Sequence, residues 1–448
     1  MKILLTTHQF FPQFAAGTEV LTYSVARELM RRGHIVRVLT GYPSHSSLAD
    51  VDRFDEYDFE GIHVYRFHHA YTPMGGQESM IEVGYDNHLG AGYFADILQS
   101  FDPALVHFFH LNRLGTGLIE RAVKVGIPCF MTPTDFWTIC PTGQLLLGDG
   151  SLCPGPSLHA GNCLKHFGQD TQKGAASKVA EWLPIAAADL LVRLTKKGFL
   201  PAYPKQVEVV AIANRLAINV LRLNQLSGLV VPNRFMKDLL TRYGVVAELI
   251  TEAAFGIDVT IPEVSGQRSN HQANLKIGFI GTLAPHKGCH VLIEAFKLLP
   301  ADTATLKIYG RLEDFPDYTT ALQLSAGKYP SIEFCGTFPN SAIAQVFADI
   351  DVLVVPSLWY ENTPLVIYSS QAAYCPVVAS NLAPLAEVIE HGANGLLFKP
   401  NCSADLAQKL SRLINESGLL QRLKANSRRP KSTKKYVDEL LHIWESVL

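Results

Sequence analysis

The sequence predicts an α/β protein with two parallel-sheet domains, on three observations. Short apolar runs alternate with helix-length segments in both halves of the chain, which is the pattern of repeated βαβ units. Residues 261–274 are rich in Pro, Gly, Ser, Asn and Gln and have no apolar period, as expected of a linker. The chain has 448 residues, 48% of them hydrophobic and 18% charged, which is enough for two globular cores.

Charge and cysteine usage restrict the class of protein further. The net charge of −2 argues against a protein that holds nucleic acid through many phosphate contacts. The apolar run at the N-terminus stops at His8, and no apolar stretch reaches the roughly 18 residues that span a bilayer. Eight cysteines without a secretion signal indicate a reducing compartment, so we expect a cytoplasmic protein.

The first half begins with a βαβ unit: a strand at 2–7, a helix at 18–32 that ends at Gly33, and a strand at 34–40. Small residues at Ala16 and Gly17 would let a ligand approach the backbone at the helix start; an ordinary helix start is the alternative. Further strands are predicted at 61–67, 104–109, 128–131, 228–232 and 249–255, and helices at 116–125 and 234–243.

Two histidines lie at the end of the 104–109 strand. We expect His107 to point into the sheet as a core residue. His110 is placed where it can reach the ligand-binding edge of a parallel sheet, although a merely solvated histidine explains it equally well.

Residues 135–170 form a long loop rich in Gly and Pro that contains Cys140, Cys153, Cys163 and His166. Three thiols and an imidazole can make a tetrahedral zinc site, but their spacing is not that of paired CxxC motifs. Buried or free thiols are the alternative, and we favour them.

The segment 171–226 is predicted to be helical and has more basic than acidic residues. The apolar residues Trp182, Leu183 and Phe199 lie between the charges, so contact with a membrane surface is one interpretation and a solvated basic side the other. The basic residues are Lys173, Lys178, Arg193, Lys196, Lys197, Lys205, Arg215 and Arg222, and the acidic ones Glu181, Asp189 and Glu208.

The second half continues the βα alternation and contains two candidate anion sites. Lys287 precedes a helix start in the loop TLAPHKG, where its charge would meet an anion attracted by free amides. Glu361 follows a buried strand, and Thr363-Pro364 is a helix-start signature. Strands are predicted at 276–281, 306–310, 332–336, 352–355 and 377–379, and helices at 290–299, 364–374 and 434–448.

Four motifs together resemble glycosyltransferase family 4, the group-one retaining transferases: AGTE at 16–19, FGID at 255–258, GTLAPHKG and PSLWYENTPL. The resemblance implies a GT-B fold, in which two Rossmann-like domains face each other across a cleft. It implies an acceptor-side domain at 1–262 and a nucleotide-sugar domain at 275–425. A C-terminal helix at 426–448 would pack back on the first domain.

The resemblance also implies site roles for individual residues. Lys287 and Glu361 would be catalytic: Lys287 binds the diphosphate and Glu361 holds sugar hydroxyls. Departures from the family pattern are Thr282 for a second basic ligand, Ser369 for a second glutamate and Thr134 for a sugar-contacting histidine. The other implied donor contacts are Gly17, Thr282, Asn362, Thr363, Leu365 and Ser369, and the implied substrate contacts are His110, Thr134 and Asp135.

The implied function is retaining transfer of a sugar from a nucleotide-diphosphate donor to a saccharide or lipid-linked acceptor in polysaccharide synthesis. The donor is a co-substrate, and neither a cofactor nor a metal is expected. Association with the inner face of the membrane is compatible with such an acceptor. The alternatives are a nucleotide-sugar epimerase or hydrolase on the same fold and a non-catalytic GT-B subunit.

Overall fold

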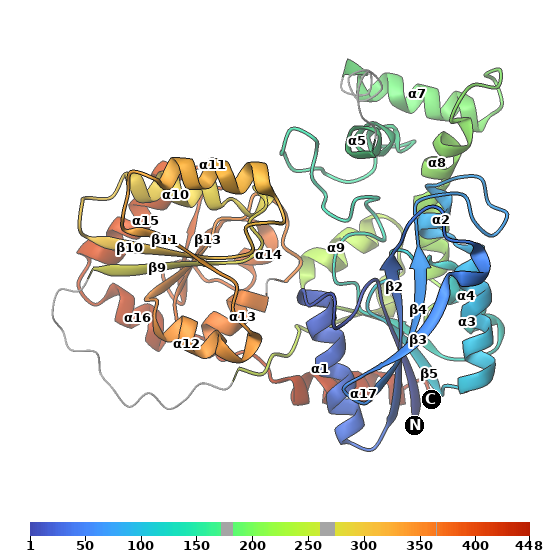
Figure 1. Ribbon diagram of the computed structural model, residues 1–448, viewed down its shortest axis with the longest axis horizontal. Coiled ribbons are helices and arrows are strands. Elements are labelled where there is room, and N and C mark those ends of the chain that lie inside the picture. Colours follow the sequence, from blue (N-terminus) through green and yellow to red (C-terminus); the bar gives the residue numbers. More distant parts are fainter. Residues whose placement is uncertain (172–181, 260–273, 364) are drawn as a thin grey trace. The chain divides into compact units, whose positions relative to one another are not determined.

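The computed structural model describes residues 1–171, 182–259, 274–363 and 365–448, and they form two compact units (Figure 1). Unit 1 comprises Met1–Asp149, Cys153–Phe255 and Thr433–Leu448; unit 2 comprises Gly150–Leu152 and Gly256–Ser432. Unit 2 therefore ends at Ser432 and not at residue 425. The predicted linker, apart from residue 274, lies outside the described residues, as do Lys173, Lys178, Glu181 and Pro364.

Unit 1 is built on an eight-stranded sheet in the order β3-β4-β2-β1-β5-β6-β7-β8, parallel except for the pair β3 and β4. Strand β3 was not predicted because its residues, FDEYDF, contain no continuous apolar run; the strand lies at the edge of the sheet and pairs with β4 alone among the described strands. The strands are β1 (Lys2–Thr7), β2 (Ile35–Pro43), β3 (Phe54–Phe59), β4 (Ile62–His69), β5 (Leu105–Phe108), β6 (Cys129–Met131), β7 (Gly228–Val231) and β8 (Ile250–Glu252).

Helices cover both faces of this sheet, with α1 on one side and α3 and α4 on the other (Figure 1). Helix α3, which was not predicted, begins where the side chain of Asn87 accepts a hydrogen bond from the amide of Gly90. The helices are α1 (Gly17–Arg31), α2 (Glu82–Tyr85), α3 (His88–Phe101), α4 (Gly117–Lys124), α5 (Gly161–Thr171), α7 (Ile185–Lys196), α8 (Gln206–Leu223), α9 (Arg234–Arg242) and α17 (Thr433–Glu445). None of the described helices combines the length and apolarity needed to cross a bilayer.

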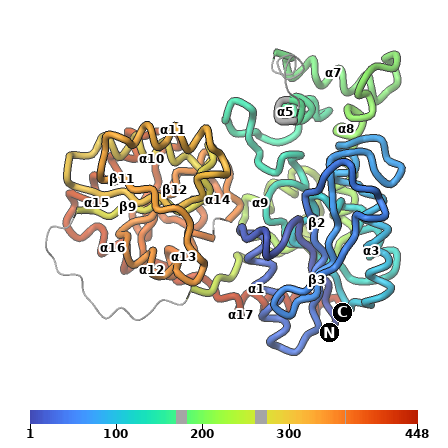
Figure 2. The backbone as a smooth tube through the Cα atoms, in the orientation of Figure 1, coloured from blue at the N-terminus to red at the C-terminus, as the bar shows by residue number. Residues whose placement is uncertain are grey.

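The C-terminal helix α17 belongs to unit 1 and runs beside α1 (Figure 2). Arg32, which follows α1, forms an ion pair with Asp438 at 2.6 Å. On the inner side, Trp444 donates a hydrogen bond from Nε1 to Nδ1 of His107 at 3.2 Å. Buried Trp444 and Tyr436 thus attach the end of the chain to the core of unit 1.

The predicted core position of His107 is confirmed, and it makes stability depend on pH. Nε2 of His107 lies 2.9 Å from the hydroxyl of Thr132, and burial lowers the pKa of His107 to about 3. Below pH 6.5 the unfolded chain binds a proton that folded His107 does not, so the free energy of unfolding falls by about 1.4 kcal/mol per pH unit from this group. The free energy of unfolding, measured by urea unfolding at several pH values between 7 and 5, should therefore change less steeply with pH in His107→Gln than in the wild type. An equally steep slope would contradict this, and exposed His88→Gln is the control.

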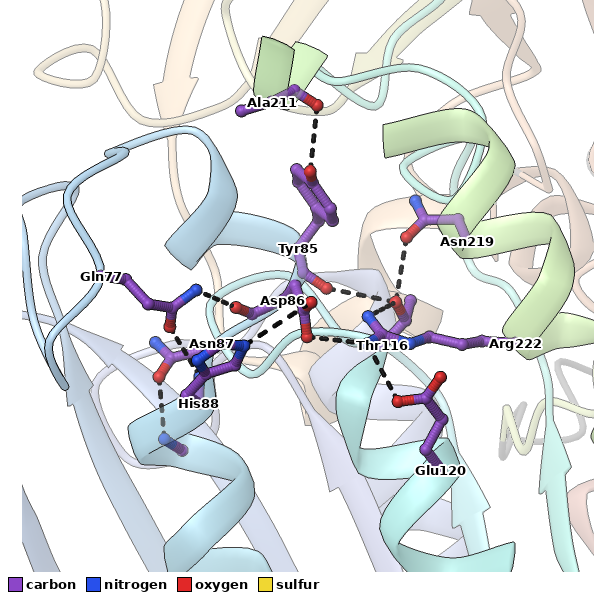
Figure 3. A network of polar contacts seen from close by, with 11 residues as sticks. Gln77, Tyr85, Asp86, Asn87, His88, Thr116, Glu120, Ala211, Asn219 and Arg222 are labelled. Carbon is purple, nitrogen blue, oxygen red and sulfur yellow. Dashed lines mark hydrogen bonds and ion pairs between the residues drawn. The ribbon is translucent and has the colours of Figure 1, made fainter. Parts of the chain in front are cut away.

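A buried polar network in unit 1 corrects the interpretation of the basic segment (Figure 3). The guanidinium of Arg222, on α8, lies 2.9 Å from Asp86 and 3.0 Å from Glu120 and donates to the hydroxyl of Thr116 at 3.1 Å. Arg215 is also buried, and its guanidinium donates to backbone carbonyls. These two arginines anchor α8 inside unit 1, so neither lies on a solvated or membrane-facing side.

Unit 2 has a six-stranded parallel sheet in the order β11-β10-β9-β12-β13-β14, with α10 and α11 on one face and α12 and α13 on the other (Figure 1). Its strands are β9 (Leu275–Ile280), β10 (Ala304–Tyr309), β11 (Ile332–Gly336), β12 (Val352–Val355), β13 (Val377–Ser380) and β14 (Gly395–Phe398). Its helices are α10 (Cys289–Lys297), α11 (Pro316–Ala326), α12 (Ile343–Ala348), α13 (Leu365–Ala372), α14 (Ala383–Ala386), α15 (Ser403–Asn415) and α16 (Leu419–Ala425).

Candidate active site

Each sheet has one point at which its strand order reverses. In unit 1 this point lies between β1 and β5, and in unit 2 it lies between β9 and β12. Open α/β sheets bind ligands outside the carboxyl ends of the strands at such a switch point. The loops that leave β9 and β12 carry Lys287 and Glu361, so the two predicted catalytic residues belong to the switch point of unit 2.

Lys287 and Glu361 form an ion pair. The Nζ atom of Lys287 lies 2.7 Å from Oε1 and 3.0 Å from Oε2 of the glutamate. Oε1 also accepts hydrogen bonds from the hydroxyl of Ser357 at 2.7 Å and from Nε1 of Trp359 at 2.9 Å. The ammonium lies 4.8 Å from the centre of the Trp359 ring, on its face. Ser357 and Trp359 were not predicted as site residues, because their hydrogen bonds to Glu361 depend on how the loop folds.

The two loops are held together through their backbones. The amide of Leu358 donates to the carbonyl of His286 at 2.8 Å. Gly288, with φ of +72°, comes so close to Pro356 that a Cβ atom there would lie 1.9 Å from the Pro356 carbonyl oxygen. A glycine is therefore needed directly after Lys287, both for the backbone conformation and for the close approach of the loops.

The charges of this site follow from burial and from the ion pair. Burial opposes ionisation of Glu361, but the Lys287 ammonium and the hydrogen bonds from Lys287, Ser357 and Trp359 outweigh it and lower the pKa of the glutamate. His286, which packs on Trp359 with ring centres 4.7 Å apart, has its pKa lowered to about 4 by burial and by the neighbouring Lys287. At neutral pH the site thus contains one ammonium, one carboxylate and a neutral imidazole.

Four of the other predicted donor contacts lie in α13 or just before it: Asn362, Thr363, Leu365 and Ser369. Asn362 is buried, and the Thr363 hydroxyl donates to the Asn362 carbonyl at 2.7 Å, which is not a helix-capping bond. The Ser369 hydroxyl, also buried, donates to the Leu365 carbonyl one turn earlier at 3.1 Å. Thr282, in contrast, is exposed. The donor roles of these residues stay predictions.

The switch point of unit 1 gathers the predicted substrate residues. Nε2 of His110, after β5, lies 2.9 Å from Oδ2 of Asp135, which follows β6. Nδ1 of His110 accepts a hydrogen bond from the amide of Asn112 at 3.0 Å, and Nε2, although close to the carboxylate, makes no hydrogen bond that meets the geometric criteria within the described part of the chain. Thr134 accepts a hydrogen bond from Thr18 at 2.9 Å.

Helix α1 starts beside this group. Gly17 is its first residue and is exposed, and Ala16 at the N-cap makes no side-chain capping bond, so α1 begins without a cap from its N-cap residue. The structure thus brings a helix start next to His110, Thr134 and Asp135 through the bond between Thr18 and Thr134.

His8 and Glu19 extend this group and were missed in the sequence. The rings of His8 and His110 lie 4.2 Å apart, and Nε2 of His8 lies 3.6 Å from the buried carboxylate of Glu19. Burial raises the pKa of Glu19; burial, followed by the charges of His110 and Arg113, lowers that of His8. One signal in the sequence could have indicated His8 as a site residue: it comes directly after a predicted strand and before a predicted helix start.

The cysteine loop contributes a separate small cavity in unit 1, which Cys140, Cys153, Cys163 and His166 all line. Burial raises the pKa of the Cys153 and Cys163 thiols. Within the described part of the chain, no group of three or more His, Cys, Asp or Glu side chains could hold a metal ion as placed. The four residues therefore share a cavity without forming the tetrahedral site considered from the sequence.

Two α/β units, each with a switch point where open sheets bind ligands, are the architecture of the GT-B class. Solved structures share this architecture. HepE of Anabaena in complex with UDP has a TM-score of 0.65 at 18% identity, over 100% of both chains. A sucrose-phosphate synthase from Thermosynechococcus elongatus has a TM-score of 0.66 at 14% identity, over 100% of this chain and 98% of the other. At these identities the likeness shows the fold alone.

The family-model match falls in unit 2: residues 263–430 match the family model described as glycosyl transferases group 1. An uncharacterized glycosyltransferase of Methanocaldococcus jannaschii is 30% identical over 34% of this chain and 38% of its own length. A D-inositol 3-phosphate glycosyltransferase of Nocardia farcinica is 27% identical over 42% and 44%. The chain thus spans less than half the length of these curated relatives. Residues 263–430 are similar to group 1 glycosyltransferase domains.

Proposed function

We propose that the protein is a retaining glycosyltransferase of family 4, which moves a sugar from a nucleotide-diphosphate donor to a saccharide or lipid-linked acceptor in glycan or polysaccharide synthesis. The observation that carries the proposal is the pairing of Lys287 with Glu361 at the switch point of a domain similar to group 1 glycosyltransferases. One group suits a diphosphate and the other suits sugar hydroxyls, and a nucleotide sugar contains both.

On the donor side, negative charge grows on the phosphate as the bond to the sugar breaks. The Lys287 ammonium and the amide end of α13 stabilise that charge, which is the role that a metal ion has in other transferases. We therefore propose a metal-independent reaction without a cofactor. Glu361 orients the sugar by accepting hydrogen bonds from its hydroxyls, and it stays ionised at neutral pH because its pKa is lowered.

On the acceptor side, we propose contacts from the switch point of unit 1. The side chain of Asp135 is 37% exposed and can accept a hydrogen bond from an acceptor hydroxyl, while the amide of Trp137 donates to its Oδ1 at 2.7 Å and Nε2 of His110 lies 2.9 Å from its Oδ2. Thr7 Oγ1 and His8 Nδ1 are buried without a hydrogen-bond partner in the described part of the chain, which supports a polar ligand here. The start of α1 at exposed Gly17 adds a position for an anionic group.

The test is a two-stage assay. Thermal unfolding is first measured with UDP-, GDP- and ADP-sugars, because a ligand that binds only the folded state raises its stability. The stabilising donor is then incubated with and without saccharide acceptors. Transfer that requires an acceptor supports the proposal. Turnover of the donor alone identifies an epimerase or hydrolase, and binding without turnover under any condition identifies a non-catalytic subunit.

We also propose that the protein works in the cytoplasm, at the inner face of the membrane, where a lipid-linked acceptor would lie. Around α7 the side chains of Trp182 and Phe199 are 85% and 70% exposed, and Lys196 and Lys197 are exposed as well. Exposed aromatic rings next to lysines suit an anionic lipid surface.

Sedimentation with vesicles checks the membrane contact. The wild type should bind vesicles that contain phosphatidylglycerol, and the double variant Trp182→Ser/Phe199→Ser should bind at least about fivefold less because it buries less apolar surface. Leu324→Ser, which removes another strongly exposed apolar side chain, is the matched control. Equal binding by the double variant and the control would remove this part of the proposal.

A further inference from the structure

The ion pair between Lys287 and Glu361 has a consequence for ligand selection. Without ligand, each charge of the site already has a partner. The Glu361 carboxylate accepts hydrogen bonds from Lys287, Ser357 and Trp359, and the Lys287 ammonium contacts both carboxylate oxygens. A ligand for one of the two residues must therefore compete with the other residue.

A nucleoside diphosphate must compete with Glu361 for Lys287, and it has no sugar hydroxyls to offer Glu361 in return. Its phosphates would be drawn to Lys287, but a buried carboxylate lies within 3.0 Å of the same ammonium and repels them. If the lysine moves to the phosphates, Glu361 loses its positive partner inside the protein, which is unfavourable for a buried charge.

A nucleotide sugar avoids that loss. Its hydroxyls can donate hydrogen bonds to Glu361 in place of the lysine, and Lys287 is then free to bind the phosphates. After transfer the sugar is gone, Glu361 again lacks its donors, and the ion pair can re-form. The same contact then favours binding of the donor and release of the product.

We propose that the Lys287–Glu361 ion pair is a selectivity element that discriminates the nucleotide sugar from the nucleoside diphosphate released by the reaction. The proposal rests on the proposed function, since it takes the ligand to be a nucleotide sugar. It makes Ser357 and Trp359 positioning residues, because they hold the carboxylate toward the ammonium. Removal of the glutamate charge should thus strengthen binding of the product and weaken binding of the donor.

The experiment compares wild type, Glu361→Gln and Trp359→Phe by calorimetric titration with UDP, GDP and ADP and with UDP-, GDP- and ADP-glucose. For the base that binds, Glu361→Gln should bind the nucleoside diphosphate at least fivefold more tightly and the glucose conjugate more weakly than the wild type. Product inhibition should increase in the same variant. Trp359→Phe removes one hydrogen bond to the carboxylate but leaves both charges in place, so it should not bind the nucleoside diphosphate more tightly. Glu294→Gln removes a carboxylate from the exposed pair with Lys297 and controls for net charge.

The outcomes separate the two proposals. Thermal unfolding first shows whether Glu361→Gln is folded. If the folded variant binds the nucleoside diphosphate no more tightly than the wild type, the selectivity role is wrong, while the proposed transferase function is unaffected. If Glu294→Gln gives the same gain, a general charge effect replaces the selectivity role. If none of the six compounds binds either wild type or Glu361→Gln, the proposed function fails and the selectivity role with it.

Discussion

Replacing Lys287 by alanine should lower kcat/KM for sugar transfer by about 100-fold, the size of effect seen when one preorganised charge-stabilising donor is removed. The ammonium lies at the switch point of unit 2, where the departing diphosphate would gain negative charge. Since the interaction strengthens in the transition state, kcat should fall and not only the affinity for the donor. Steady-state kinetics with the donor found by thermal unfolding is the measurement.

Two comparisons make the Lys287 result interpretable. Lys297→Ala removes a lysine from a pair with Glu294 on α10 and should leave transfer unchanged, because exposed pairs contribute only about 0–1 kcal/mol. Lys287→Ala also leaves Glu361 without its cation, so the folded fraction of each variant is measured at the assay temperature. Turnover within about threefold of wild type in a folded Lys287→Ala protein would remove the catalytic assignment.

The second large effect is expected from Gly288→Ala. A Cβ atom at this position would lie 1.9 Å from the Pro356 carbonyl oxygen. Because that oxygen belongs to the backbone, no side-chain rotamer change can relieve the clash. The loops after β9 and β12 must therefore separate, which breaks the contact between Lys287 and Glu361. We expect donor binding to be lost almost completely and the melting temperature to fall, as measured by calorimetric titration and thermal unfolding.

Gly418→Ala provides the control for backbone strain. Gly418 precedes α16 with φ of +78°, close to the +72° of Gly288 before α10, but its Cβ atom would meet nothing within 4 Å. Both variants carry the cost of a left-handed alanine, about 1–2 kcal/mol, and only Gly288→Ala has the clash. Equal donor affinity in the two variants would show that the loop contact is not needed for binding.

The elements that the sequence predicted are those with a strong local pattern. The continuous apolar run Val352–Val355 gave a buried strand, and Gly33 gave the end of α1. Strand β3 was missed because Asp55, Glu56 and Asp58 interrupt its apolar residues, so it has no such run. The start of α13 was predicted from Thr363-Pro364, yet the Thr363 hydroxyl bonds to a carbonyl, because the cap depends on loop geometry.

The candidate site shows the same division. Lys287 and Glu361 could be selected from the sequence because Lys287 precedes a predicted helix start and Glu361 follows a predicted strand, where parallel sheets bind ligands. Their partners could not: Trp359 and Ser357 reach the carboxylate only through the fold of one loop, and His8 meets His110 across two neighbouring strands.

The α/β class and the two charged residues in the loops that follow β9 and β12 could thus be predicted, since both depend on residues close together in the chain. That Lys287 and Glu361, 74 positions apart, neutralise each other, and that α17 returns to unit 1, became visible in the folded chain. The reason is the order of the strands: β9 lies beside β12 although β10 and β11 come between them in the chain. No local pattern of side chains contains that order.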